Sequence, residues 1–463
     1  MPALLVVLLA CHAPTDTAGF DTGPSAVPWA ADLPPLAAEI GSVRGYTPLR
    51  AIIHLHSPLS HDACDGEGYV DGAIDEACLA EEHEALCRLS VDVAFLSDHP
   101  AYAATVPWQD TLLLRGDDTP VEVDGVPVGK AIHCADGHEA LWLPGFEDEL
   151  MPVAIGAPAL EPGPELEALY NRADTEAIAA MQAAGATVLQ AHPEERSVEE
   201  LARRQDDGIA GLELYNLHAL LDPDEREEIF GLDPFGWLED IAPFSDEDGT
   251  AEPDLLFLAF HQEMLPNVER WDALAARGPA VGLAGTDAHR NVLPMTLRDG
   301  ERPDGFRRNM RWFSNHLLAT GTDPAAAEEA LANGRLYAVF EVLGTPQGLA
   351  FWYVDAAGTE HEQGGEAAAG GTLHLDCPAL SPSSPRDGSG PPAITATVFL
   401  DGTAWQEGCG AWEVTEPGVY RARVDIVPTH LAGFLGEDPS PFLRPYPWIH
   451  TNPVRVTSAA AAR

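Results

Sequence analysis

Positively charged side chains are scarce in this sequence of 463 residues. Lysine and arginine together number 25, with Lys130 as the single lysine, against 74 aspartates and glutamates, and the formal net charge is −49. A surface this acidic repels nucleic acid and anionic lipid headgroups at long range. The composition therefore argues against a nucleic-acid-binding protein. An anionic substrate would need local positive charge, which bound metal ions can supply.

Several motifs are also missing. The sequence contains no Gly-x-Ser-x-Gly and no phosphate-binding P-loop, so a serine hydrolase and a nucleoside triphosphatase have no support. It contains no Cys-x-x-Cys zinc pattern and no internal repeat. The apolar run at residues 1–10 is shorter than the roughly 20 residues that a membrane-spanning helix needs.

The beginning of the sequence indicates export. Residues 1–11 resemble a bacterial lipoprotein signal, because an apolar run ends at Cys11, the residue that would be lipidated. An ordinary secretory signal is the alternative, and it also implies export. Residues 12–38 are rich in Thr, Asp, Gly, Pro and Ala, which predicts a flexible tether. We therefore expect a membrane-anchored bacterial lipoprotein, periplasmic or at the cell surface, that contacts the membrane only through its lipid.

Cysteine usage agrees with export. After Cys11 the chain has six cysteines, an even number that favours disulfides in an exported protein: Cys64, Cys78, Cys87, Cys134, Cys377 and Cys409. Cys377 and Cys409 lie alone in the C-terminal region and are predicted to pair. Cys78 and Cys87 are too far apart along one predicted helix to bond to each other. We therefore predict that Cys64 pairs with Cys78 and that Cys87 pairs with Cys134. The alternative is a set of free buried thiols.

Six short apolar runs each end in side chains that can bind a metal ion. The residues at their ends are His54, His56, Asp98, His99, Glu147, His192, Glu213, Asn216, Asp287 and His289. Short apolar runs bounded by Gly, Pro or Asp are typical of buried strands. Parallel strands that each end in such a residue indicate an α/β barrel with its polar groups gathered at one rim.

After the tether, the pattern of predicted strands and helices divides the chain into two domains. Residues 39–343 alternate strand-like and helix-like segments, which predicts a parallel sheet closed into a barrel. Residues 72–90 and 164–184 are among the predicted helices. An acidic, proline-rich stretch at 221–265 is predicted to be an insertion over the rim. Residues 344–463 contain short alternating strands between turns, which predicts an all-β sandwich.

Two of the motifs have the spacing of a chelating pair. His54 and His56 are separated by one residue, as are Asp287 and His289, so each pair lies on one side of its strand. Mixtures of imidazole and carboxylate suit Zn²⁺, Mn²⁺ or Fe²⁺. Two such ions about 4 Å apart activate a water molecule and bind a transferring phosphoryl or acyl group.

Taken together, the motifs resemble those of the PHP family, the polymerase and histidinol phosphatase superfamily. They match in order and spacing at residues 54–62, 96–99, 144–147, 191–193 and 285–289. The resemblance implies a distorted (β/α)7 barrel that binds two or three divalent metal ions, Zn, Mn or Fe. Most members hydrolyse phosphoesters. Residues 447–453 resemble the closing motif of the β-sandwich in exported members.

The resemblance also implies the ligand sets. His54, His56, Glu147 and Asp287 would hold the first ion, and Glu147 with His192 the second. A third ion would be held by His61 or Asp62, together with His99 and His289.

One ligand is missing from the pattern. Related sequences carry a histidine several residues after the glutamate, but no histidine follows Glu147 closely here. Either the second ion is weakly bound or absent, or the replacement is Asp148 or a histidine from elsewhere in the chain: His133, His138, His218 or His261.

The resulting hypothesis is an exported metal-dependent hydrolase that uses a metal-bound hydroxide, first on phosphoesters of small molecules. The alternatives are hydrolysis of carboxyl or carbamate esters or amides at the same site, and a non-catalytic cell-surface binding module with a degenerate barrel. The residues expected to assist proton transfer are Asp98, His99 and His289. Those expected to contact substrate are Tyr215, Asn216 and Arg290.

Overall fold

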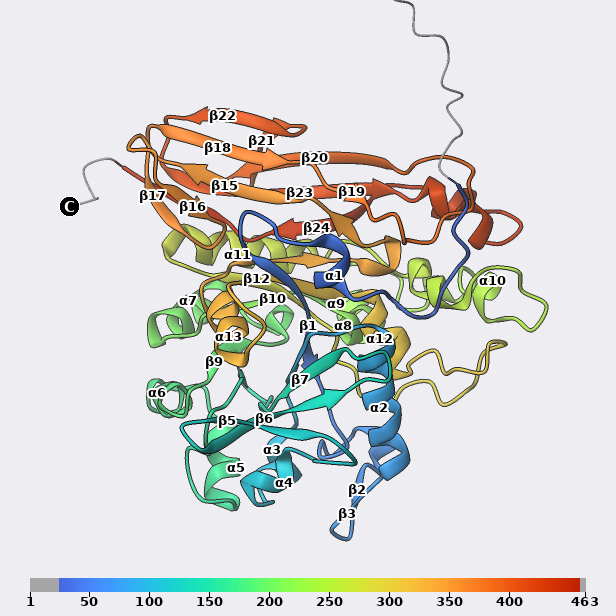
Figure 1. Cartoon of the computed structure of the whole chain (residues 1–463), viewed down its shortest axis with the longest axis vertical. Helices are drawn as coiled ribbons and strands as arrows, with labels where there is room; N and C mark the ends of the chain where they lie inside the picture. Colours follow the sequence, from blue (N-terminus) through green and yellow to red (C-terminus); the bar gives the residue numbers. More distant parts are fainter. Residues whose placement is uncertain (1–24, 459–463) are drawn as a thin grey trace, which may run out of the picture.

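The chain folds into a mixed α/β barrel with antiparallel sheets packed over one end (Figure 1). The computed structural model describes residues 25–458. The sheets of the C-terminal part lie above the barrel, and helices surround the barrel's strands (Figure 1). The predicted fold class, an α/β barrel followed by an all-β sandwich, is confirmed.

The barrel is a ring of short, buried strands in two sheets. In ring order they are β1 (Thr47–Leu55), β4 (Val93–Leu96), β7 (Glu139–Leu143), β8 (Met151–Val153), β9 (Thr187–Gln190), β10 (Gly211–Asn216) and β11 (Val281–Gly285). Neighbours within each sheet are parallel, except that β8 runs antiparallel to β9. Backbone hydrogen bonds close the ring at two seams. Asp287 N donates to His54 O at 2.8 Å at one seam, and Phe146 N donates to Pro152 O at 3.0 Å at the other.

Helices cover the outside of the ring, because the strands are apolar on both faces. The main ones are α2 (Glu76–Arg88), α5 (Pro164–Tyr170), α6 (Thr175–Ala183), α7 (Val198–Asp207), α11 (Leu265–Arg277), α12 (Phe306–Trp312) and α13 (Pro324–Ala332). The predicted single helix at 164–184 is wrong, since it is two helices. The side chain of Asp174 accepts hydrogen bonds from the backbone N–H groups of Glu176 and Ala177, so it caps the start of α6.

The barrel and the C-terminal sandwich share a sheet. β12 (Ser314–Ala319) runs antiparallel to β1, and β13 (Leu336–Val339) continues the sheet to β24 (Tyr446–Thr451) and then β23 (Gly418–Val427). A second sheet is formed by β16 (Glu360–Glu362), β15 (Ala350–Val354), β18 (Gly371–Asp376) and β22 (Gly410–Val414). The buried amide of Asn452 bonds both the N–H and the C=O of Gly282, at 2.8 Å each. This contact fixes the end of the sandwich against β11.

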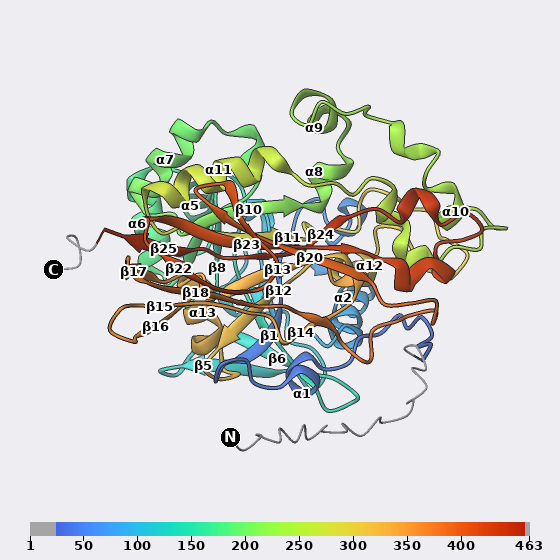
Figure 2. The ribbon, with the colours of Figure 1, turned by 90° about the horizontal axis from the view of Figure 1, so that it is seen from above.

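The segment between β10 and α11 forms short helices and no strand of the barrel. They are α8 (Leu217–Leu221), α9 (Pro223–Glu228), η3 (Gly236–Leu238), α10 (Ala242–Ser245) and η4 (Pro253–Ala259). In Figure 2, α9 and α10 lie at the margin of the molecule. Asp254 in η4 anchors this segment to α12, since its carboxylate accepts hydrogen bonds from Arg307 at 2.6 Å and Arg308 at 2.7 Å.

The predicted flexible tether is wrong for residues 25–38, which pack against the body of the protein. Trp29 donates from its indole N–H to Asp254 Oδ2 at 3.1 Å, and its ring lies against Phe434 and under the guanidinium of Arg311. The helix α1 (Leu36–Ile40) follows directly. The predicted signal at residues 1–11 with Cys11, and the tether's residues 12–24, lie outside the described residues.

The cysteine pairing is as predicted. Within residues 25–458 there are three disulfides, Cys64–Cys78, Cys87–Cys134 and Cys377–Cys409. Disulfides form and persist in oxidising compartments, so they favour a location outside the cytoplasm. Among residues 25–458, the helices are all too short or too polar to span a bilayer.

The single lysine of the chain is completely buried. Lys130 Nζ lies 2.8 Å from both His83 Nε2 and the carbonyl oxygen of Leu113, 3.2 Å from Asp118 Oδ2, and over the ring of Trp142. Burial lowers its pKa to about 8.

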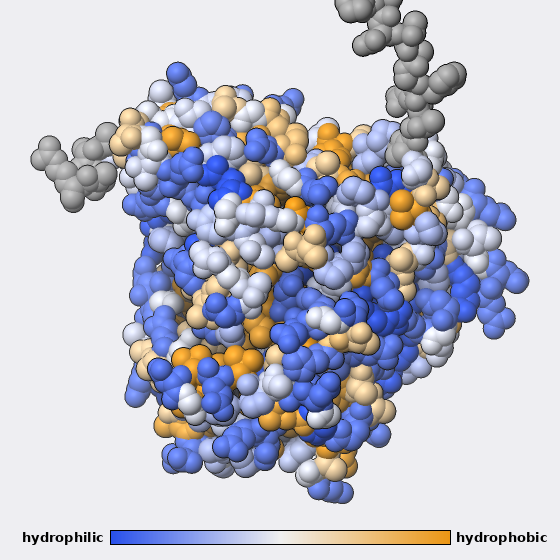
Figure 3. Space-filling view, viewed as in Figure 1, coloured by the Kyte–Doolittle hydropathy of each residue, from blue (hydrophilic) through white to orange (hydrophobic). Residues whose placement is uncertain are grey.

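The face in Figure 3 is mainly hydrophilic, with hydrophobic residues scattered over it.

Replacing Asp254 with Asn is expected to destabilise the protein by about 3–5 kcal/mol, because it leaves the buried guanidinium of Arg311 without its ion pair and leaves Arg307 and Arg308 with only Glu301 and Asp299. Burial alone would raise the pKa of Asp254, but Arg311, Arg307 and Arg308 outweigh it and hold the pKa well below its usual range. This stabilisation is present above the ordinary aspartate pKa of about 3.9 and is lost as the pH falls toward the lowered value.

Urea unfolding near neutral pH and below pH 4 measures both effects. Asp206→Asn is the matched control, since Asp206 pairs with Arg277 on the exposed surface and such pairs contribute about 1 kcal/mol at most. Equal destabilisation by the two variants would contradict the anchoring role of Asp254.

Candidate metal centre

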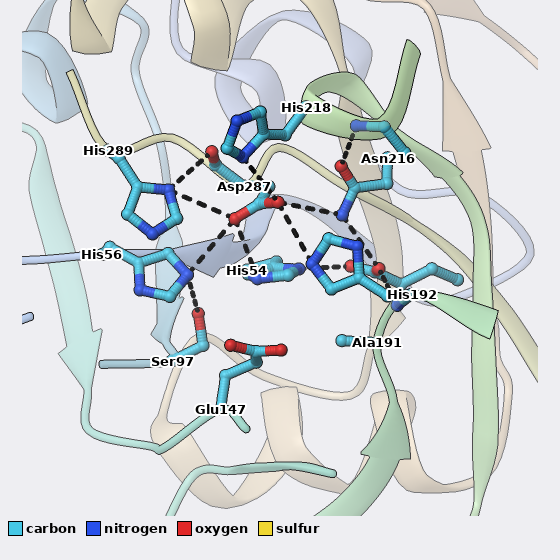
Figure 4. Close-up of polar contacts among 12 residues, drawn as sticks. His54, His56, Ser97, Glu147, Ala191, His192, Asn216, His218, Asp287 and His289 are labelled. Carbon is cyan, nitrogen blue, oxygen red and sulfur yellow. Dashed lines mark hydrogen bonds and ion pairs between the residues drawn. The ribbon is translucent and has the colours of Figure 1, made fainter. Parts of the chain in front are cut away.

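The carboxylate of Asp287 is the centre of the polar cluster at the barrel mouth (Figure 4). Its Oδ1 lies 3.1 Å from His54 Nε2, 3.3 Å from His56 Nε2 and 3.3 Å from His289 Nδ1. These residues lie at the ends of β1 and just beyond β11, which are joined at the seam of the ring. The hydrogen bond between Asp287 N and His54 O therefore brings the two motifs together.

The second oxygen of Asp287 faces a different set of side chains. Its Oδ2 lies 3.3 Å from His192 Nε2, 3.5 Å from His218 Nδ1 and 3.2 Å from Asn216 Nδ2. His192 follows β9, Asn216 ends β10, and His218 lies in the first turn of α8. The carboxylate thus lies between the two sheets of the barrel.

The backbone is unusual at three of these positions. His54, His192 and Asp287 have φ angles of 64°, 45° and 49°, in the left-handed region that non-glycine residues rarely adopt. Such conformations cost of order 1–3 kcal/mol each and cluster at functional sites, where the surrounding structure enforces them. Here they occur where each strand ends and its side chain turns toward the cluster.

Most histidines of the cluster have one ring nitrogen bound to the protein. The Nδ1 contacts are His54 with Glu213 Oε1 at 2.6 Å, His56 with Ser60 Oγ at 2.9 Å, His99 with Glu147 O at 2.9 Å and His192 with Glu194 Oε1 at 3.1 Å. Such contacts fix the tautomer and orientation of metal-binding histidines and leave Nε2 to bind the metal. The arrangement is therefore one that could hold metal ions.

Several polar atoms of the cluster are buried without a hydrogen-bond partner among residues 25–458. They are His54 Nε2, Asp62 Oδ1, Asp287 Oδ1 and His289 Nε2. Buried polar atoms are nearly always satisfied in folded proteins, so each of these needs an explanation. Divalent cations satisfy imidazole nitrogens and carboxylate oxygens together, and the residues present fit them.

A further group of ligand atoms lies beside the first. His56, His99 and His289 offer nitrogens within 4.8 Å of one another, and so do His61, Asp62 and His99 with their own ligand atoms. The rings of His56 and His289 stack with centroids 3.6 Å apart. Burial, followed by the proximity of His289, lowers the pKa of His56 well below its usual value, which keeps the imidazole neutral as metal binding requires.

Glu147 connects these groups. Its carboxylate lies 3.0 Å from His99 Nδ1, and it offers an oxygen within 4.8 Å of ligand atoms of His54 and His192. Figure 4 shows its side chain directed at the cluster from the side opposite Asp287. The structure thus brings together all the residues predicted as metal ligands: His54, His56, His61, Asp62, His99, Glu147, His192, Asp287 and His289.

Of the histidines considered as the missing ligand, His218 reaches the cluster and the others lie elsewhere. His133 pairs with Glu139 on the surface, and His138 contacts the carbonyl oxygen of Val91. His261 is buried among aromatic rings. Asp148 lines the cavity described below.

Three residues predicted to act at the site make contacts of other kinds. Asp98 accepts hydrogen bonds from both the N–H and the hydroxyl of Ser57, at 2.6 and 2.7 Å, so it positions the loop after His56, and its part in proton transfer stays a prediction. Tyr215 is completely buried, and its hydroxyl lies 3.1 Å from His450, on the sandwich side. Arg290 pairs with Glu81 at 2.8 Å and does not line the main cavity.

A cavity of about 610 Å³ opens over the cluster. His61, His99, Glu147, His192, His218, Asp287 and His289 form its floor, and the segment between β10 and α11 contributes Asp222, Asp224 and Glu225 to its wall. Among the described residues that line it, Arg196 is the one arginine or lysine.

The sequence did not predict a role for Arg196, because nothing in its local sequence distinguishes it from the other arginines. It did not predict a role for Glu194 either, because nothing in its local sequence distinguishes it from the other glutamates.

Comparisons with known proteins give little beyond this geometry. No protein-family model matches the sequence, and no curated protein matches it. Among solved structures, the chain is similar to a two-domain protein from Bacteroides vulgatus containing a predicted PHP-like metal-dependent phosphoesterase. The two are 12% identical, the alignment covers 88% of this chain and 96% of that chain, and the TM-score is 0.36.

Replacing Glu213 with Gln is expected to weaken metal affinity by about 10–100-fold, because the carboxylate orients His54 from behind. Competition with a fluorescent chelator for Zn²⁺ or Mn²⁺ measures the affinity. Glu139→Gln is the matched control, since Glu139 makes the same kind of contact with His133 on the surface, at 3.0 Å. An unchanged affinity for Glu213→Gln would mean that the Glu213 contact does not support metal binding by His54.

Proposed function

We propose that this chain is an exported metal-dependent hydrolase of the PHP type that acts on phosphoesters of small molecules. The observation that carries the proposal is the set of buried, unpartnered ligand atoms of His54, Asp287 and His289 beneath an open cavity. The motifs that resemble the PHP family provide these same side chains. The lipid anchor at Cys11, and with it a periplasmic or cell-surface location, belongs to the same proposal.

The residues at the centre have different proposed roles. His54, His56, Glu147, His192 and Asp287 would hold divalent ions, which would supply a Lewis acid and lower the pKa of a bound water. Glu213 and Glu194 hold the imidazoles of His54 and His192 in place. His99 and His289 line the cavity beside Asp62, where they can bind a further ion or transfer a proton.

Arg196 is the residue best placed to bind an anionic group of the substrate. Its guanidinium lies 3.2 Å from Glu149 and 3.8 Å from Glu200, whereas Arg204 contacts the same two carboxylates at 2.9 and 2.8 Å. Its Nε is buried without a hydrogen-bond partner in the described part of the chain. Arg196 also lies 3.9 Å from Glu195. Because Arg204 makes the shorter contacts with Glu149 and Glu200, we propose that Arg196 directs a donor to a phosphoryl oxygen from the cavity wall.

The cavity and the charge of the chain define the class of substrate. A volume of about 610 Å³ suits a small molecule. The acidic wall formed by Asp222, Asp224 and Glu225 disfavours nucleic acid, in agreement with the net charge of −49. We therefore propose a small phosphoester as substrate, with neither nucleic acid nor a lipid surface as a partner of this site.

Asp287→Asn is expected to lower kcat/KM for a generic aryl phosphoester by about 10³-fold or more, because metal ions contribute several kcal/mol to such reactions. The assay uses protein reconstituted with Zn²⁺ or Mn²⁺, with metal content measured in parallel. His133→Gln is the control for loss of a histidine away from the centre. Turnover of a carboxyl or carbamate ester alone would replace the phosphoesterase with an esterase. No turnover of either ester, with metal bound, would favour a binding module.

Arg196→Met is expected to lower kcat/KM for the phosphoester by about 10–100-fold, since hydrogen bonds to charged groups contribute about 1.5–3 kcal/mol. Metal content should not change, and Arg196→Lys should recover part of the loss. Arg277→Met is the control, because Arg277 lies on the surface and pairs with Asp206. Loss of metal in Arg196→Met would show that Arg196 supports the centre instead of the substrate.

A further inference from the structure

We propose that the Cys64–Cys78 disulfide positions His61 and Asp62 for a third metal ion, so that binding of this ion depends on the oxidised cysteine pair. The inference rests on the proposed function, because the ion belongs to the same centre. It gives Cys64 and Cys78 the part of positioning residues, which the disulfide of the C-terminal sandwich does not share.

His61 and Asp62 lie on the loop of residues 57–64, which leads from β1 to the disulfide. Asp62 Oδ2 lies 3.3 Å from His289 Nε2 and 3.7 Å from His99 Nε2. Its Oδ1 is buried without a hydrogen-bond partner among the described residues. The Asp62 side chain is 34% exposed, whereas that of His289 is 4% exposed. Side-chain packing therefore does little to hold Asp62 in place, and its position depends on the backbone of the loop.

The end of the loop nearer β1 is held by hydrogen bonds. Ser57 donates from its N–H and its hydroxyl to Asp98, at 2.6 and 2.7 Å. Ser60 Oγ accepts the N–H of His99 at 2.9 Å and lies 2.9 Å from His56 Nδ1. These contacts join the loop to the ends of β1 and β4, so this end is held without the disulfide.

The other end of the loop is held by the disulfide together with two backbone hydrogen bonds. Cys64 N donates to His289 O at 2.9 Å, and Asp65 N donates to Arg290 O at 3.1 Å. Cys64 and Asp65 have φ angles of 57° and 61°, in the left-handed region that non-glycine residues rarely adopt. Such a conformation persists only where the surrounding structure enforces it. Cys78 provides the covalent restraint, since it is buried in the first turn of α2.

Loss of the disulfide would remove this restraint two residues beyond Asp62. The backbone at Cys64 and Asp65 would then relax, and the Asp62 carboxylate would no longer be held beside His289. Contacts that hold metal ligands in position typically change metal affinity by about 10–100-fold. The remaining candidate ligands follow strands of the barrel, which the disulfide does not join, so we expect the effect to be confined to the third ion.

Metal content of the full chain tests the proposal. Wild type, Cys64→Ala/Cys78→Ala and the control Cys377→Ala/Cys409→Ala are loaded with Mn²⁺ alone, dialysed under the same conditions and measured by mass spectrometry. Cys64→Ala/Cys78→Ala is expected to retain two of three equivalents and to bind the third about 10–100-fold more weakly. A higher Mn²⁺ concentration should restore it. Asp62→Asn should lose the same equivalent, and its combination with the cysteine variant should lose no more.

Hydrogen exchange of the metal-free proteins provides a readout that does not depend on the ions. Residues 57–68 should exchange faster in Cys64→Ala/Cys78→Ala than in wild type, because the loop opens more often. The same residues should exchange at the wild-type rate in Cys377→Ala/Cys409→Ala. A general loss of stability would instead speed exchange throughout the barrel and weaken all the ions in parallel.

The outcomes separate this proposal from the proposed function. Circular dichroism checks that each variant is folded, and Cys64→Ser/Cys78→Ser is the second variant if Cys64→Ala/Cys78→Ala is not. Wild-type affinity for all three ions in the folded variant, or parallel weakening of all three, would overturn the positioning role. So would the same loss in Cys377→Ala/Cys409→Ala, or a wild type that binds only one or two ions. Wild type that binds no Mn²⁺ would overturn the proposed function itself.

Discussion

The structure of the barrel mouth depends on one buried carboxylate. Asp287 is 5% exposed and lies among His54, His56, His192, His218 and His289. A buried charge is costly unless it is paired. Cations bound between the carboxylate and the ring nitrogens would remove this cost. The strained backbone at His54, His192 and Asp287 shows that the fold enforces this arrangement instead of relaxing around it.

The parallel strands explain why these residues meet. The candidate ligands lie at or beyond the carboxyl ends of β1, β4, β7, β9 and β11, and the ring of strands brings those ends to one rim. Because this geometry follows from apolar runs that end in His, Asp or Glu, the sequence was enough to predict the barrel and which of these side chains gather at its rim. The disulfides of Cys78 and Cys87 were predictable from helix geometry. The distance between the two residues along one helix excludes a bond between them, so each pairs with another cysteine.

Other features could not be predicted from the sequence, because they depend on contacts between distant residues or on a local shift in strand pairing. Trp29 packs because Asp254, far away in the chain, accepts its N–H, so the composition of residues 25–38 was misleading. In β10 the pairing register shifts between Glu213 and Tyr215. As a result Glu213 and Asn216 both face the centre, 3.2 Å apart, while Tyr215 faces the sandwich. Simple alternation along a strand cannot reveal such a shift.

The burial of Lys130 has a practical consequence for work with this protein. Since it is the single lysine of the chain and is 0% exposed, the folded surface offers no lysine amine for cross-linking, immobilisation or fluorescent labelling. Reagents that activate carboxylates would instead find many targets on so acidic a surface. Amine-directed reagents would modify Lys130 only after the barrel opens, so its rate of modification reports on unfolding of the region around Trp142.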